Sequence, residues 1–217
     1  MKKILIIIIL LCFSTASSIH ASIINIPADY STIQEGINVA LSHDIIMVAG
    51  GTYKENIVIN KDIELMGADT DTTIIDGSGT GTVVSIGSAG VTVGYFTIIN
   101  SGSGTEDAGI KIACADNCII EHCKCVSNYA GLDLFGSGFN HLKNSELSGN
   151  YVGVRFRESD PCMSKSNRDN VIESNIIAQN DYCGIQFEHT GLVHHFSNII
   201  KLNMIRNNFW IFFSHFF

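Results

Sequence analysis

Charged and amide side chains occupy one matching position in several similar segments of this chain. Each segment ends on two apolar residues that flank one variable residue, and these variable residues are Lys111, Asp133, Arg155 and Gln186. Two positions further on come Arg157 and Glu188. Carboxylate oxygens are ligands that Ca²⁺ prefers, and a basic group of lowered pKa can remove a proton. Brought together, these six residues would form a substrate-binding surface.

The same column also fits a purely structural interpretation. Neighbouring parallel strands lie about 4.8 Å apart, so Lys111, Asp133 and Arg155 would each touch the next member of the column. Cross-strand ion pairs of this kind are common on sheets, and each contributes less than about 1 kcal/mol when exposed. The sequence alone leaves the binding surface and the ion-pair ladder as alternatives.

Cysteine and histidine form a second candidate cluster. Cys114, Cys118, Cys123 and Cys125 bracket His122, and thiolates suit a soft metal such as copper. Against this, Cys118 and Cys123 stand where related segments have Asn or Ser, and Cys125 stands where they have Leu or Ile. Buried cysteine behaves as a small hydrophobic residue. The pattern therefore favours structural cysteines.

These residues lie in repeats of one pattern. The clearest copy is Asn170–Phe187, NVIESNIIAQNDYCGIQF, and others are Cys118–Leu134, Asn140–Phe156 and Asn198–Phe213. Their last strands align two apolar columns, Ile110, Leu132, Val154, Ile185 and Ile211, and Ile112, Leu134, Phe156, Phe187 and Phe213. Alternation of period two predicts a strand with one buried face. Short strands at such a repeat length predict the stacked coils of a parallel β-helix.

A polar column lies in the middle of each repeat. It consists of Cys123, Ser145, Asn175 and Asn203. Side chains of this type can bond the backbone of adjacent coils at a bend. We therefore predict an inward ladder at one corner of the solenoid.

An N-terminal segment and the repeats together resemble a known family. Ile26–Ile59 contains IPADYSTIQEGI followed by GTYKE, and the repeats follow it. Together they resemble the right-handed parallel β-helices of the pectin-lyase-like superfamily, in its NosD-like branch; Gly36 stands where that pattern has Ala. The resemblance implies an all-β, right-handed, single-stranded parallel β-helix solenoid with an N-terminal capping helix. This fold hosts many activities, so it does not fix one.

The resemblance also implies site roles. In lyases of this fold, aspartates bind calcium and an Arg or Lys removes a proton. Carried over, Asp133 with Asp160 would hold Ca²⁺, and Arg155 or Lys111 would be the base. The catalytic sets of pectin methylesterases and polygalacturonases have no complete counterpart in this sequence.

Three regions are expected along the chain. Residues 1–18 resemble a secretory signal peptide, with Lys2 and Lys3 before an apolar run. Residues 19–44 would hold a strand and a capping helix from about Ser31 to Leu41, with a capping box of Ser31 and Gln34. Residues 45–217 would form the coils. Their end, FWIFFSHFF, is apolar and predicts an incomplete last coil or self-association through it.

Composition and leader indicate where the protein acts. The signal peptide predicts a secreted, periplasmic or cell-surface protein without a stable membrane span. An oxidising compartment would let Cys114, Cys162 and Cys183 pair. The formal charge of −8 argues against nucleic acid as a partner.

The leading hypothesis is a module that binds, or presents a face to, a polysaccharide or cell-surface glycan. The first alternative is a lyase or hydrolase that acts on acidic polysaccharide with Ca²⁺. The second is a NosD-like periplasmic metal-associated protein.

Overall fold

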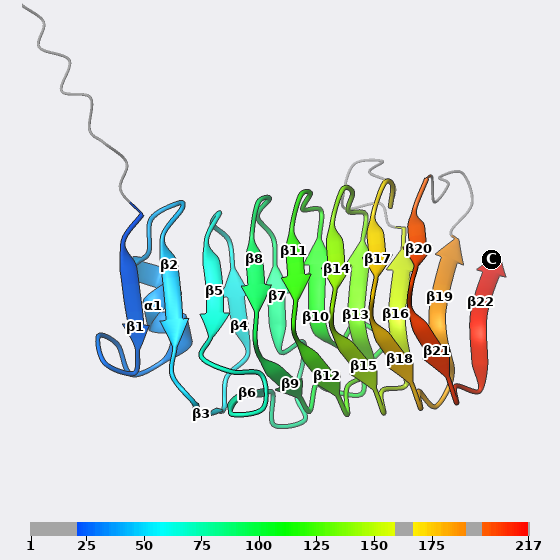
Figure 1. The fold of residues 1–217 in the computed structure, drawn as a ribbon, viewed down its shortest axis with the longest axis horizontal. Helices are drawn as coiled ribbons and strands as arrows, with labels where there is room; N and C mark the ends of the chain where they lie inside the picture. Colours follow the sequence, from blue (N-terminus) through cyan, green and yellow to red (C-terminus); the bar gives the residue numbers. More distant parts are fainter. Residues whose placement is uncertain (1–20, 159–166, 190–196, 217) are drawn as a thin grey trace, which may run out of the picture.

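The computed structural model of this chain describes residues 21–158, 167–189 and 197–216. They form three parallel sheets wound around one long axis (Figure 1). From β2 onward each coil contributes one strand to each sheet, and every strand pairs in parallel with its counterpart in the next coil. The chain is therefore an all-β parallel β-helix, as the repeats predict.

We name the three sheets A, B and C. Sheet A contains β1 (Ile23–Ile26), β2 (Ile45–Val48), β5 (Glu64–Gly67), β8 (Thr92–Gly94), β11 (Ile119–Glu121), β14 (His141–Lys143), β17 (Val171–Glu173) and β20 (Ile199–Lys201). Sheet B contains β3 (Gly51–Tyr53), β6 (Thr73–Asp76), β9 (Thr97–Ile99), β12 (Lys124–Val126), β15 (Glu146–Ser148), β18 (Ile176–Ala178) and β21 (Met204–Arg206). Sheet C contains β4 (Ile57–Ile59), β7 (Val84–Ile86), β10 (Ala108–Ala113), β13 (Ala130–Phe135), β16 (Val152–Arg157), β19 (Cys183–His189) and β22 (Trp210–Phe216).

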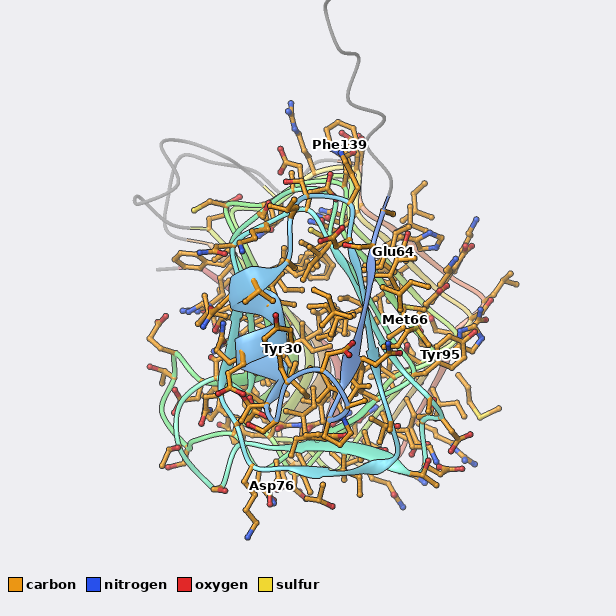
Figure 2. The ribbon with its side chains drawn as sticks, turned by 90° about the vertical axis from the view of Figure 1, so that its left-hand side faces the viewer. Tyr30, Glu64, Met66, Asp76, Tyr95 and Phe139 are labelled. Atoms are coloured by element: carbon orange, nitrogen blue, oxygen red, sulfur yellow. The ribbon has the colours of Figure 1, made fainter. Side chains whose placement is uncertain are left out.

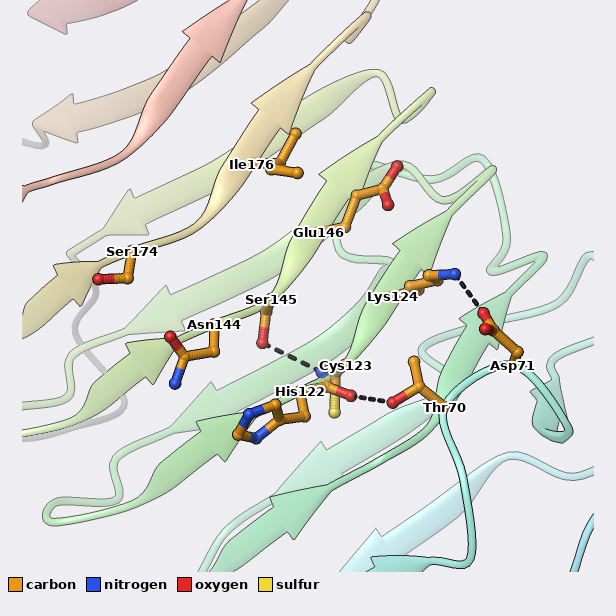
Figure 3. A pocket seen from close by; sticks show the side chains of 10 residues that line it. All are labelled: Thr70, Asp71, His122, Cys123, Lys124, Asn144, Ser145, Glu146, Ser174 and Ile176. Carbon is orange, nitrogen blue, oxygen red and sulfur yellow. Dashed lines mark hydrogen bonds and ion pairs between the residues drawn. The ribbon is translucent and has the colours of Figure 1, made fainter.

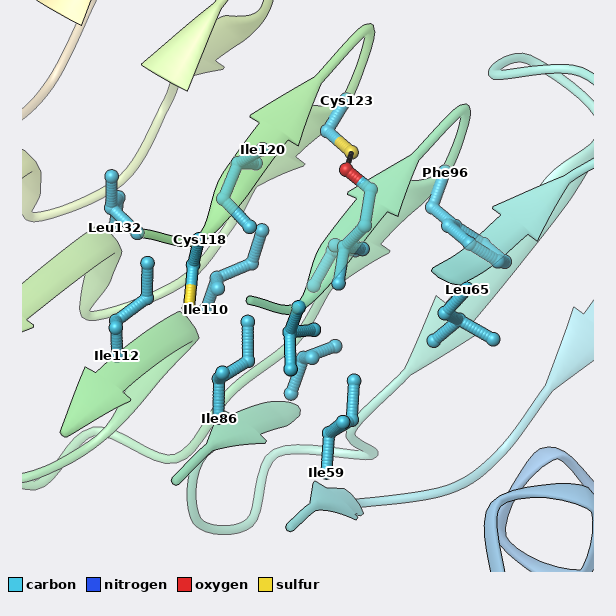
Figure 4. Close-up of a cluster of buried hydrophobic side chains, with 14 of the residues drawn as sticks. Ile59, Leu65, Ile86, Phe96, Ile110, Ile112, Cys118, Ile120, Cys123 and Leu132 are labelled. Atoms are coloured by element: carbon cyan, nitrogen blue, oxygen red, sulfur yellow. Dashed lines mark hydrogen bonds between the residues drawn. The ribbon is translucent and has the colours of Figure 1, made fainter. Parts of the chain in front are cut away.

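The apolar columns fill the interior of the coils. On sheet C, Ile59, Ile86 and Ile112 stack in register, and all three are buried (Figure 4). Further along the same column, the rings of Phe156 and Phe187 stack with centroids 4.7 Å apart. The predicted inward apolar columns of β10, β13 and β16 are therefore confirmed, but on β13 and β16 the outward residues Asp133 and Arg155 are buried as well.

The register of the last strand differs from the prediction by one residue. We expected Ile211 opposite Ile185, but the structure pairs Ile185 with Phe212. One residue separates Asn208 from β22, as one separates Asn150 from β16, so Trp210 lies in the column of Val152 and Cys183 and not in that of the glycines.

Within the described ranges the one helix, α1 (Ile33–Val39), lies over the N-terminal end of the solenoid (Figure 2). Its side chains Ile33 and Ile37 are buried in the main core cluster. The predicted capping box was placed one residue too early, because Thr32 is the N-cap and it exchanges hydrogen bonds with Glu35. Leu41 lies beyond the helix and is exposed, so it does not belong to the apolar face.

The predicted polar ladder is confirmed at the corner between sheets A and B. The Asn175 side chain accepts a hydrogen bond from the Ser145 backbone N–H at 2.9 Å and donates one to the Leu142 carbonyl at 3.1 Å. The Asn175 N–H in turn donates to Asn203 Oδ1 at 2.9 Å. Each amide therefore bonds backbone groups of neighbouring coils that water does not reach.

Two further ladders hold the other corners. They consist of Cys118, Asn140, Asn170 and Asn198 between sheets C and A, and of Asn128, Asn150, Asn180 and Asn208 between sheets B and C. The residues just before Asn170, Asn175 and Asn180 have φ values of 54°, 59° and 55°. This left-handed backbone conformation turns the chain sharply at each corner.

The last coil exposes apolar side chains. Leu202, Met204, Phe209 and Trp210 are all exposed. Self-association through this coil stays a prediction.

We predict that Asn175→Ala lowers the free energy of unfolding by about 2–4 kcal/mol, because it leaves the Ser145 N–H and the Leu142 carbonyl buried without their partner. The exposed Asn60→Ala is the matched control and should be nearly neutral. Chemical denaturation checks both variants. If Asn175→Ala were as stable as the wild type, the ladder would not be what stabilises this corner.

Candidate functional site

The strands of sheet C bring the predicted surface residues together. Lys111, Asp133, Arg155 and Gln186 lie opposite one another on β10, β13, β16 and β19. Arg157 pairs with Glu188 in the neighbouring column. The expected open surface is nevertheless absent at its centre, because the Asp133 and Arg155 side chains are 0% and 1% exposed.

Asp133 is the centre of an ionic cluster. Arg155 donates from Nε to Oδ1 at 3.2 Å and from Nη2 to Oδ2 at 3.1 Å. Arg157 donates from Nε to Oδ1 at 3.1 Å and from Nη2 to Oδ2 at 2.6 Å. Two guanidinium groups thus hold one buried carboxylate, and bidentate pairs of this kind fix geometry strongly. We call Glu106, Lys111, Asp133, Arg155 and Arg157 the sheet C cluster.

This geometry argues against the roles carried over from lyases. Both oxygens of Asp133 already accept hydrogen bonds from arginine, so they are not open to Ca²⁺. Arg155 is buried against that carboxylate and does not face a substrate. The proposed second calcium ligand, Asp160, lies outside the described residues.

Glu106 completes the cluster and was missed by the sequence reasoning. Its carboxylate accepts hydrogen bonds from Nη1 and Nη2 of Arg157 and from Nζ of Lys111, the last at 2.9 Å. The Arg157 hydrogen bond, followed by that of Lys111, lowers the pKa of Glu106 to about 2. Burial raises the pKa of the nearby Glu188. Glu106 lies in a connecting segment outside the repeat, so no column reveals it.

Aromatic rings pack against the cations of the cluster. The Arg155 guanidinium lies 5.2 Å from the Tyr129 ring centre, and Arg157 and Lys111 lie 4.7 Å and 5.1 Å from that of Phe135. Cation–π contacts at these distances are attractive. The cluster therefore supports Tyr129 from one side.

Tyr129 begins a stack of tyrosines at the corner between sheets B and C. Tyr129 and Tyr151 have ring centres 5.1 Å apart, and Tyr151 and Tyr182 have ring centres 5.2 Å apart. The Tyr129 N–H donates to Ser101 Oγ at 2.9 Å, which ties the corner to the preceding loop. Burial raises the pKa of Tyr129, so its hydroxyl stays protonated at neutral pH.

A hollow of about 450 Å³ opens beside this stack. We call it the tyrosine groove; Ser101, Ser103, Asn128, Tyr129, Tyr151 and Asp181 contribute to its lining. Tyr151 is 41% exposed. The groove thus offers an aromatic wall together with the hydroxyl of Ser103 and the carboxylate of Asp181, whereas the Asn128 amide is engaged in the inward ladder.

A second hollow, of about 410 Å³, lies at the corner between sheets A and B (Figure 3). We call it the polar groove. Its walls are His122, Asn144 and Ser174 on one side and Lys124, Glu146 and Ile176 on the other, with Thr70 and Asp71 at one end. Sequence reasoning missed this groove.

The described cysteines do not gather into a metal centre. Cys118, Cys123, Cys125 and Cys183 are buried free thiols, whereas Cys114 is disulfide-bonded. Burial raises the pKa of Cys118 to about 11 and that of Cys123 to about 12, which disfavours the thiolate that a metal needs. Within the described ranges, no three His, Cys, Asp or Glu side chains are grouped to hold a metal ion. Cys162 lies outside those ranges.

A membrane-spanning helix is likewise not found in the part of the chain that the structure describes. The predicted signal peptide, residues 1–18, lies outside this part.

The winding of the coils agrees with a known family. The model of the family described as "Right handed beta helix region" matches residues 70–214, so this chain belongs to that family. The predicted right-handed parallel β-helix solenoid is thereby confirmed. The narrower NosD-like placement stays a prediction.

Solved structures with this fold share little sequence with the chain. The A-module of a mannuronan C-5 epimerase from Azotobacter vinelandii matches with a TM-score of 0.60 at 16% identity, over 80% of this chain and 53% of its own. An alginate lyase from Paenibacillus matches with a TM-score of 0.53 at 15% identity, over 78% and 72%. A pectin methylesterase from Yersinia enterocolitica matches with a TM-score of 0.51 at 15% identity, over 76% and 57%.

At these identities the likeness shows the fold alone. This chain spans little more than half the length of the epimerase module and the methylesterase. Comparison with curated protein sequences gives no match.

We predict that Arg155→Met costs about 3–5 kcal/mol of stability, because it strips a buried carboxylate of one guanidinium partner. Lys111→Met is the matched control. It removes an ion pair to the exposed Glu106, so it should cost less than about 1 kcal/mol. Chemical denaturation distinguishes them. If both variants lose the same small amount, the sheet C cluster is not a structural centre.

Glu106→Gln should change the acid stability of the fold. The pKa of Glu106 in the folded protein is about 2, below the ordinary value of 4.5. The ionised carboxylate therefore stabilises the fold fully at pH values above 4.5. That contribution is lost as the pH falls through about 2. Glu106→Gln should therefore be less stable than wild type at pH near 6, and the difference should vanish at the acid end. Unfolding curves across this range test the slope, with the exposed Glu64→Gln as control.

Proposed function

We propose that this protein is a carbohydrate-binding β-helix module that holds a polysaccharide in the tyrosine groove. The observation that most supports this is a stacked, partly exposed tyrosine wall beside the hydroxyl of Ser103 and the carboxylate of Asp181. Binding sites commonly join aromatic surface to a few convergent polar groups. A sugar offers apolar C–H faces for the first and hydroxyls for the second.

The sheet C cluster would then serve binding indirectly. Arg155 is buried and lies over the Tyr129 ring, so it would fix the ring without touching the sugar. Tyr151, the more exposed ring, would make the main contact, and Asp181 would accept hydrogen bonds from sugar hydroxyls. In this proposal Lys111, Asp133, Arg155 and Arg157 are positioning residues.

The fold is compatible with such a ligand. The structural neighbours are named as a mannuronan epimerase, an alginate lyase and a pectin methylesterase, and all three names refer to polysaccharides. We propose on the signal-peptide pattern that the mature chain works outside the cytoplasm, where such polymers occur.

Tyr151→Ala should weaken binding to the recognised polysaccharide by about tenfold or more, since stacked aromatic contacts dominate sites of this kind. Affinity electrophoresis or calorimetry with neutral and acidic polysaccharides measures it. Tyr30→Ala is the matched control, because Tyr30 is similarly exposed but lies at the N-terminal end of the solenoid (Figure 2).

Two results would contradict the proposal. One is a wild-type chain that binds none of the polysaccharides. The other is wild-type binding that survives both Tyr151→Ala and Asp181→Asn unchanged.

A further inference from the structure

We propose that the polar groove is a second glycan site, which binds the end of a neutral sugar chain. It shares no lining residue with the tyrosine groove, so the inference does not rest on the proposed function. The two hollows lie at opposite corners of sheet B.

The walls of the polar groove follow the axis of the solenoid. Lys124, Glu146 and Ile176 lie opposite one another on β12, β15 and β18, with their side chains outward. Cys123 and Ser145 of the inward ladder form its floor. The groove is therefore an elongated trough across three coils, which is a shape suited to a short stretch of linear polymer.

A loop closes the trough on its N-terminal side. Residues 69–72 fold along the axis over the next coil, where Thr97 Oγ1 donates to the Thr70 carbonyl at 2.7 Å. Thr70 Oγ1 then donates to the His122 carbonyl at 2.6 Å, and Asp71 pairs with Lys124 (Figure 3). This wall stands at one end of the trough, so a sugar chain that lies along the trough would end against it.

The lining offers hydrogen-bonding groups of both kinds. Lys124 donates, Glu146 accepts, and Asn144 does both, while Ile176 supplies an apolar contact. His122 stacks on Tyr95 at 4.8 Å, and among the described residues its buried Nδ1 has no hydrogen-bond partner. A buried N–H without a partner is costly, so the ring proton is better placed on Nε2, where it is a donor.

The charges of the lining select against acidic sugars. Asp71 and Glu146 outnumber the single cation, Lys124, which is already paired with Asp71. A carboxylate or sulfate on the ligand would meet uncompensated negative charge. A neutral sugar would instead use its hydroxyls as donors to Glu146 and as acceptors from Lys124.

Calorimetric titration of the full chain with neutral hexasaccharides tests this. The probes are cello-, xylo-, manno- and laminarihexaose, each compared with its long polymer at equal sugar mass. We expect at least one hexasaccharide to bind, and per unit mass the long polymer to bind far more weakly because it has fewer ends.

Variants assign the binding to the groove. Glu146→Gln and Lys124→Met should each weaken binding by about tenfold, the scale of a lost charge-assisted hydrogen bond. Glu64→Gln, an exposed glutamate on β5 away from the groove, and Tyr30→Ala, at the N-terminal end of the solenoid, should leave it unchanged. Thermal melts confirm that each variant is folded.

Four outcomes would overturn the inference. They are no binding of any neutral hexasaccharide, equal binding of polymer per unit mass, binding that survives Glu146→Gln and Lys124→Met, and binding lost on Tyr151→Ala alone. The last would assign the ligand to the tyrosine groove and so leave the proposed function standing.

Discussion

The structure depends on side chains that bond the backbone where the chain turns. A solenoid with short strands has many buried corners, and each corner leaves N–H and carbonyl groups that sheet pairing does not use. Ladders such as that of Ser145, Asn175 and Asn203 supply these partners from one coil to the next. Because the ladders point inward, they leave the outer surface free to vary. The two grooves lie on this outer surface, at corners that the ladders hold.

Charged residues are buried on sheet C but accessible at the corner between sheets A and B. On sheet C, Asp133 is buried with two arginines, and such a cluster has a steep cost if one partner is lost. It fixes the strands and the adjacent Tyr129. At the corner between sheets A and B, Lys124 and Glu146 stay accessible to a ligand. Burial therefore separates residues that hold the fold from residues that can meet a sugar.

The sequence predicted the solenoid well because its signal is periodic. The apolar columns, the inward ladder and the capping helix all follow from residue type and spacing. The period-two pattern predicts that the side chains of Asp133 and Arg155 point outward from the sheet. It does not predict which residues pack over them, so their burial was not foreseen. The predicted N-cap is one residue from the observed one because Ser31 and Thr32 both form hydrogen bonds with Glu35. Only the backbone conformation distinguishes which of the two is the N-cap.

The grooves could not be predicted for a related reason. The polar groove depends on residues 69–72, which cross to a neighbouring coil and carry no repeat signal. Glu106 and Ser101 likewise lie in a connection, and they reach their partners only through the fold. Contacts between a repeat and a non-repeating segment are set in three dimensions, and one sequence does not record them.

The most direct test of this account is a polysaccharide binding panel, run with and without Ca²⁺ and followed for ultraviolet absorbance of unsaturated sugars. With a structural sheet C cluster and two binding grooves, we predict saturable binding that Ca²⁺ does not change, without release of unsaturated product. Calcium-dependent release of such product, lost on replacement of Arg155 in a variant that is still folded, would contradict it and make the cluster a catalytic site.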